Sequence, residues 1–130
     1  MFLLDTDIVI YNMKGNIEVQ KNLREYINDP IKISVITLME LYYGAQKSKK
    51  VSANLAKIKT LEQSIETIPV GLESTAIFGI LKAQLEITGN RLDDFDLIIA
   101  SCAMAHNLTL VTNNIKHFKR IDGLKLTNWA

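Results

Sequence analysis

The feature that most constrains the fold of this chain is the alternation of short apolar runs with longer segments of helical periodicity. A continuous apolar run bounded by polar residues is typical of a buried parallel strand. Residues 2–4 form such a run, residues 31–36 are a second strand candidate in which Ser34 breaks the apolar run, and residues 108–112 and the shorter segment 125–127 are further candidates. Strands that alternate with helices predict an α/β sandwich with a mostly parallel sheet.

The segments between these runs show the spacing of three and four residues that is typical of amphipathic helices. Asp29-Pro30, Gly44 and Gly89-Asn90 predict helix ends. Residues 96–106 are apolar on nearly all sides, which predicts a central, buried helix. Four further segments carry apolar residues at this helical spacing. They are Val19, Leu23 and Ile27; Leu38, Leu41, Tyr42 and Ala45; Leu55, Ile58, Leu61 and Ile65; and Leu72, Ala76, Ile80, Ala83 and Ile87.

Length and composition narrow the class of protein. With 130 residues, of which 48% are hydrophobic, residues 1–130 are expected to form a single domain with its own core. The net charge of +1 means that contact with RNA or DNA would depend on local clusters of basic residues. Cys102 is the only cysteine, which excludes an internal disulfide and a zinc knuckle. No apolar run approaches the roughly 20 residues of a membrane span, and the first strand leaves no room for a signal peptide. We therefore expect a cytoplasmic protein without membrane contact.

Acidic residues follow the first strand and begin two of the helices. Asp5 and Asp7 come directly after residues 2–4, and catalytic groups of open α/β sheets gather at such strand ends. Either Asp5 or Asp7 could instead simply cap the next helix, and Asp7 alone is better explained in that way. Glu40 lies just beyond the second strand, so a parallel neighbour would bring it to the same edge as Asp5. Asp93-Asp94-Phe95-Asp96 opens the buried helix, and capping accounts for only one or two of its three acids.

These acids predict a divalent cation. No Lys or Arg neighbours Asp5, Glu40 or Asp96 in the sequence to neutralise them, and carboxylates and waters suit Mg²⁺ or Mn²⁺. Such ions activate water and stabilise charge on a phosphoryl group, so phosphodiester hydrolysis is the favoured reaction. His106 and His117 lie far from the acids in sequence and are interpreted as structural or surface residues.

Seven short segments, in this order and spacing, form a pattern that is typical of one family. They are Leu3–Ile8, Ser34–Leu41 with Gly44, Asp96–Ala100, Leu110–Asn114, His117-Phe118, Gly123-Leu124 and Asn128-Trp129. The pattern resembles the PIN-domain ribonucleases, and most closely their VapC-like toxins of type II toxin–antitoxin systems. The resemblance implies a PIN-like three-layer α/β/α sandwich with about five strands.

The same resemblance implies a function. The chain would be a Mg²⁺-dependent endoribonuclease, with Mn²⁺ as a substitute ion, that hydrolyses RNA with a metal-activated water. It would be the toxin of a toxin–antitoxin pair, would be neutralised by a small antitoxin protein, and would form a homodimer. Asp5, Glu40 and Asp96 would hold the metal, and Asp94 would be an additional acid.

The resemblance also assigns supporting residues. Thr112 would order the site by hydrogen bonding, with Thr6, Ser34 and Asn114 as further supporting groups. Two positions depart from the family's common pattern. Asp7 stands where many members have asparagine, and Asn114 stands where many have a fourth acid, which bears on whether one metal ion binds or two.

Two basic clusters are candidates for RNA contact. Lys116, Lys119 and Arg120 follow the strand that ends at Thr112, and we expect them to bind RNA. For the second cluster, RNA contact and simple solvation are equally good explanations. It consists of Lys47, Lys49, Lys50, Lys57 and Lys59. Antitoxin binding is expected on apolar surface between residues 17 and 66.

Two rival interpretations remain open from the sequence. The opening motif also resembles that of the haloacid-dehalogenase-like phosphatases, in which Asp5 would be a nucleophile and Asp7 an acid/base. That family needs a catalytic lysine after a later strand, and no lysine in this chain fits that place. The other rival is an inactive binding module of the same fold. In that case Asn114, in place of a fourth acid, would be a sign that the activity has been lost.

Overall fold

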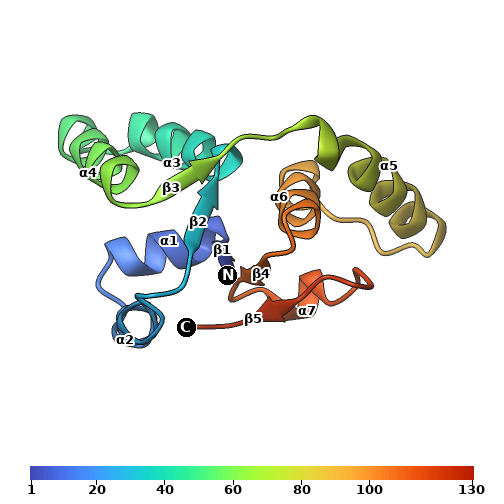
Figure 1. Cartoon of the computed structure of the whole chain (residues 1–130). Helices are drawn as coiled ribbons and strands as arrows, with labels where there is room; N and C mark the ends of the chain where they lie inside the picture. The colour runs from blue at the N-terminus through green and yellow to red at the C-terminus, as the bar shows by residue number, and fades with distance from the viewer.

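A computed structural model describes residues 1–130 and contains one parallel sheet between layers of helices (Figure 1). The strands are β1 (Phe2–Leu4), β2 (Ile31–Ser34), β3 (Glu66–Ile68), β4 (Thr109–Val111) and β5 (Leu126–Thr127). Their order is β3-β2-β1-β4-β5, and every pairing is parallel. Leu4 at the end of β1 is in register with Ile33 of β2 and Val111 of β4. The carboxyl ends of these three central strands therefore meet at one edge.

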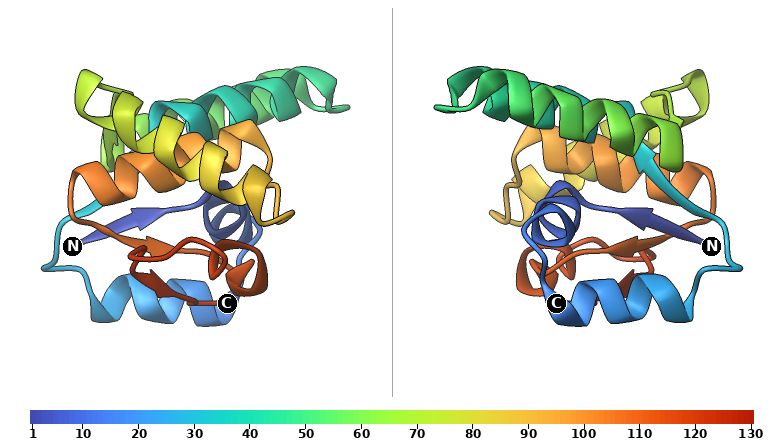
Figure 2. Two further views of the ribbon diagram at one scale, coloured as in Figure 1. Left: turned by 90° about the vertical axis from the view of Figure 1, so that its right-hand side faces the viewer. Right: turned by 90° about the vertical axis from the view of Figure 1, so that its left-hand side faces the viewer.

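Helices cover both faces of the sheet (Figure 2). They are α1 (Thr6–Met13), α2 (Ile17–Glu25), α3 (Val35–Lys47), α4 (Val51–Ser64), α5 (Leu72–Ile87), α6 (Asp94–Ala105) and α7 (Ile115–Phe118). The predicted α/β/α sandwich with a five-stranded parallel sheet is confirmed. None of the helices has the length and apolar composition that a bilayer crossing requires.

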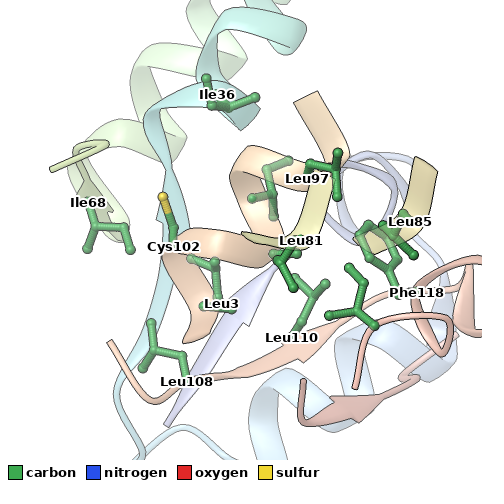
Figure 3. Close-up of a cluster of buried hydrophobic side chains, with 14 residues drawn as sticks. Leu3, Ile36, Ile68, Leu81, Leu85, Leu97, Cys102, Leu108, Leu110 and Phe118 are labelled. Atoms are coloured by element: carbon green, nitrogen blue, oxygen red, sulfur yellow. The ribbon is translucent and has the colours of Figure 1, made fainter. Parts of the chain in front are cut away.

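Leu3 and Leu4 are neighbours in β1 but belong to different hydrophobic cores, because successive side chains of a strand point to opposite faces of the sheet. Leu3 packs with Leu81 and Leu85 of α5 and with Leu97 of α6 (Figure 3). On the other face, Leu4 belongs to a cluster with residues of α1, α2, α3 and α4 and with Trp129. The sheet is thus fixed from both sides, which holds the carboxyl end of β1 in place.

Two helices differ from the sequence prediction. Helix α3 does not end at Gly44 but continues to Lys47, because Leu41 and Ala45 are buried and pack the helix past the glycine. Helix α5 forms as predicted, but the apolar stripe that predicted it is exposed. The residues that α5 buries are Ser74, Leu81 and Leu85. Helix α6 is central and largely buried, as predicted.

Candidate functional site

Asp5 directly follows β1 and is the only fully buried acid of the chain, with 6% of its surface exposed. Its carboxylate accepts two hydrogen bonds of 2.9 Å, one from the backbone N–H of Thr6 and one from the hydroxyl of Thr112. Burial, followed by the charge of Asp7, raises the pKa of Asp5 to about 7. A carboxylate that is this hard to ionise favours a nearby cation or a proton.

Asp7 lies in the first turn of α1, and the residue that caps this helix is Asp5. The capping role predicted for Asp7 is therefore wrong. Its Oδ2 accepts a hydrogen bond of 3.0 Å from the backbone N–H of Asn113, while its Oδ1 is buried and has no partner. Burial raises the pKa of Asp7. Asp5 and Asp7 therefore lie close together as acids that no basic side chain neutralises, and they begin the acidic cluster of this site.

Glu40 comes from α3 and is held by hydroxyl groups. The Thr6 hydroxyl donates to Oε1 of Glu40 at 2.8 Å. Because a hydroxyl has one hydrogen, the Thr37 hydroxyl is the donor in its 3.0 Å contact with the Thr6 oxygen. Ser34 caps α3 by accepting from the backbone N–H of Thr37 at 3.2 Å. Sequence reasoning missed Thr37, although its place one helical turn before Glu40 could have indicated it.

Asp96 lies in the first turn of α6 and is half-buried. Its pKa is raised, mainly by burial and against the opposing effect of His117. Nε2 of His117 is 3.4 Å from Oδ2 of Asp96. The interpretation of His117 as a structural or surface residue is therefore corrected, because the short helix α7 returns the chain to Asp96 after β4.

The other two acids at the start of α6 have separate partners. Asp93 caps the helix by accepting from the backbone N–H of Phe95 at 3.2 Å. Asp94 is exposed and pairs with Lys82 of α5, with Nζ 3.0 Å from Oδ1. The structure does not bring Asp94 into the acidic cluster, because the lysine of the neighbouring helix holds it outside.

Thr112 is fully buried at the end of β4, where its hydroxyl links two segments. It donates to Oδ2 of Asp5 and accepts a hydrogen bond of 3.0 Å from the backbone N–H of Asn114. Asn114 acts through its backbone, because its carbonyl accepts from the backbone N–H groups of His117 and Phe118. The side chain of Asn114 makes no capping bond.

The basic residues after β4 lie on exposed surface. Lys116, Lys119 and Arg120 form no ion pair with any acid, and Arg120 donates to the backbone carbonyl of Arg91 at 3.3 Å. A separate cleft of about 460 Å³ opens beside Glu40 between α1, α3 and α4. Lys57, from the second basic cluster, lies on its wall.

The residues present fit a hard divalent cation. The site offers carboxylate oxygens, which suit Mg²⁺ or Mn²⁺, and no Lys or Arg pairs with Asp5, Glu40 or Asp96. The unpartnered Oδ1 of Asp7 shows that the cluster is not satisfied by the chain alone. No three of the acids are close enough to form a ready-made ligand set. A bound ion would therefore have to draw the side chains together.

The parallel sheet, with acidic side chains at the carboxyl ends of its central strands, is the arrangement of a known protein family. The chain belongs to the PIN-domain family, whose family model matches residues 2–124. Membership in this family excludes the phosphatase interpretation, and the predicted family is confirmed.

Within this family, the chain is similar to VapC proteins. It is 42% identical to "Ribonuclease VapC2" of Rickettsia felis over 131 residues, which cover 99% of this chain and 98% of the relative. It is 35% identical to the "tRNA(fMet)-specific endonuclease VapC" of Shigella flexneri over 132 residues, with the same coverage. The crystal structure of VapBC2 from Rickettsia felis bound to a promoter DNA fragment contains a chain that superposes with a TM-score of 0.94 at 41% identity. That match covers 99% of this chain and 98% of the other.

Proposed function

We propose that this protein is a Mg²⁺-dependent endoribonuclease, with Mn²⁺ as a substitute ion, and the toxin of a toxin–antitoxin pair. The observation that carries the proposal is Asp5, a buried carboxylate that has a pKa raised to about 7 and no basic partner. The charges of Asp7 and Asp96 contribute to this rise, so a divalent cation would relieve the repulsion. The similar VapC proteins are named as a ribonuclease and a tRNA-specific endonuclease, which supports the reaction type.

Asp5, Glu40 and Asp96 would hold the ion. When bound, the ion would activate water for attack and stabilise charge on the RNA phosphate. Hydroxyl groups of the chain orient the carboxylates beforehand: Thr112 holds Asp5, and Thr6 holds Glu40. Groups of this kind, which orient the ligands from outside, strongly affect metal affinity and activity.

The RNA would lie along the surface of α7. Lys116, Lys119 and Arg120 follow the site strand closely in sequence and are free of acidic partners, so they can bind backbone phosphates. Lys14 and Lys57 line the cleft beside Glu40 and supply further positive charge there. The specificity named for the Shigella flexneri relative makes tRNA the first substrate class to test.

The antitoxin would bind an apolar hollow between α1, α2 and α4. This hollow has a volume of about 340 Å³, and Leu23, Ile27, Leu61 and Ile65 are among its lining residues. Ile27 is 73% exposed, so apolar surface is open to a partner beside this hollow. Most of its lining residues lie in the region between residues 17 and 66 that was predicted for this partner, and the others come from β1 and α1.

Growth of cells that express the chain alone tests the toxin proposal. We expect growth arrest from the parent, and relief of that arrest by Asp5→Asn, Glu40→Gln or Asp96→Asn. Asp94→Asn is the matched control, because Asp94 is in the same helix as Asp96 but pairs with Lys82. It should remain toxic. Three folded site variants that are as toxic as the parent would show that the site has been placed wrongly.

A further inference from the structure

His117 lies beside the acidic cluster and has no role in the proposed function. Nε2 of its imidazole ring is 3.4 Å from Oδ2 of Asp96, one of the proposed metal ligands. Both side chains are 28% exposed, so the contact lies at the half-buried rim of the cluster. Neutral imidazole is the commonest metal ligand among protein side chains, which makes this ring a candidate ligand.

The backbone and a buried neighbour hold the ring in place. The His117 ring packs edge-on against the ring of Phe118, with the centroids 5.8 Å apart, and Phe118 is fully buried. The backbone N–H groups of both residues donate to the carbonyl of Asn114. The backbone N–H of Asn114 donates in turn to the hydroxyl of Thr112, which holds Asp5. The turn that orients Asp5 therefore also positions the imidazole.

The separation between His117 and Asp96 is longer than that of a good hydrogen bond. N–H···O hydrogen bonds are about 2.7–3.2 Å long, whereas this contact is 3.4 Å. Two neighbouring ligands of an octahedral ion lie about 3 Å apart, because each bond is about 2.1 Å long. The imidazole nitrogen and the carboxylate oxygen therefore need only a small movement to bind the same ion.

This side of the site contains no carboxylate. Residues 109–121, which form β4, α7 and the turns beside them, include no Asp or Glu. The acids at positions 5, 40 and 96 come from other segments and offer only oxygen ligands. His117 is the one side chain of residues 109–121 whose type commonly binds transition metals. It would add a nitrogen ligand where no acid stands.

We propose that His117 is a nitrogen ligand of the metal ion and that it gives the site a preference for first-row transition ions over Mg²⁺. The inference rests on the proposed function, because it concerns the same ion. Mg²⁺ is a hard cation that takes oxygen ligands. Imidazole suits transition ions, for which the affinity of a given site rises from Mn²⁺ through Fe²⁺ to Co²⁺. The ion must draw His117 toward the acids, as it must draw the acids together.

Competition between Mn²⁺ and Mg²⁺ for the purified full chain measures this preference. Free Mn²⁺ is determined from its EPR signal, first alone and then with increasing Mg²⁺. In the test variant His117→Gln, the amide can still donate a hydrogen bond to Asp96 but offers no imidazole nitrogen. Its Mn²⁺ affinity should fall at least about tenfold, since even groups that only orient a ligand contribute about 10–100-fold. Its Mg²⁺ affinity should change little, because an amide oxygen suits Mg²⁺.

His106→Gln is the matched control. His106 also lies against a carboxylate, with Nε2 3.1 Å from Oε1 of Glu73, but it is at the opposite end of α6 from Asp96. This variant should bind both ions as the parent does. If the parent binds both ions and His117→Gln has an unchanged ratio of the two affinities, the inference is overturned while the proposed metal site stands. If the parent binds neither ion, the proposed function fails and the inference fails with it.

Pulsed EPR of Mn²⁺ bound to the parent identifies the ligand directly and does not require a variant to fold. A nitrogen bound to Mn²⁺ couples to its electron spin, and histidine labelled with ¹⁵N shows whether that nitrogen belongs to an imidazole. We expect this coupling in the parent and in His106→Gln, and its loss in His117→Gln. A histidine that only oriented Asp96 from outside would bind no metal and give no such coupling. Bound Mn²⁺ without imidazole coupling would overturn the proposal, as would coupling that persists in the folded His117→Gln protein.

Discussion

Replacing Asp5 with asparagine should stabilise the metal-free protein while it removes a proposed metal ligand. The folded chain raises the pKa of Asp5 from 3.8 to about 7. The folded state therefore holds this proton more tightly than the unfolded state does. The contribution of Asp5 to the free energy of unfolding is greatest below pH 3.8 and falls as the pH rises to about 7. Above pH 7 the metal-free parent has lost the whole contribution.

The magnitude follows from the size of the pKa change. A rise of about three pH units corresponds to about 4 kcal/mol at 1.36 kcal/mol per unit, and between pH 5 and pH 8 the loss is about 2.5 kcal/mol. Asparagine does not ionise, and it accepts the capping hydrogen bond from Thr6 about as well as aspartate does. Asp5→Asn should therefore be more stable than the parent at pH 8, and the difference should shrink toward pH 5.

Urea denaturation in EDTA at pH 5, 6, 7 and 8 measures this difference. Adding Mg²⁺ at pH 8 should restore stability to the parent and leave Asp5→Asn nearly unchanged, because ligands that bind only the folded state stabilise it. If the stability difference between the two proteins were constant from pH 5 to pH 8, the reasoning about Asp5 would be refuted.

Three further predictions concern neighbouring residues. Asp7→Asn should leave metal-dependent RNA cleavage nearly intact, since asparagine can still accept from Asn113; a folded variant without activity would make Asp7 essential. Replacing Lys116, Lys119 and Arg120 with alanine should flatten the salt dependence of RNA binding, because fewer counterions are released; an unchanged slope in a filter-binding assay would place the RNA elsewhere. Ser34→Ala should lower the free energy of unfolding by about 1 kcal/mol through loss of the α3 cap, and equal stability in urea would contradict that role.

The sequence predicted the sheet and most of the helices because their apolar periodicity is local. It did not predict the strand order, which depends on how distant segments pair. The end of α3 was misplaced because glycine only permits a helix to stop, whereas the burial of Leu41 and Ala45 makes it continue. The exposed stripe of α5 was not recognised as exposed, because periodicity shows that a face is apolar but not which surface covers it.

For the site, the sequence indicated which acids follow strands but not which partners they have. Asp94 and Asp96 look equivalent in sequence. In the structure, however, Asp94 pairs with Lys82 from another helix, whereas Asp96 lies against His117. Partners of this kind come from tertiary packing, and neither of them neighbours these acids in the sequence. The place of Thr37 one helical turn before Glu40 was visible in the sequence, but its contact with the hydroxyl of Thr6 comes from tertiary packing.

The most direct test of the central claim is cleavage of RNA by the purified protein with and without a divalent cation. We expect tRNA to be cut in the presence of Mg²⁺ or Mn²⁺, the cutting to stop in EDTA, and it to resume when excess Mg²⁺ is added. Asp96→Asn should be inactive and Asp94→Asn active under the same conditions, which ties the activity to this site and excludes a contaminating nuclease. Cleavage at an equal rate in EDTA, or equal activity of the folded Asp96→Asn protein, would contradict the account.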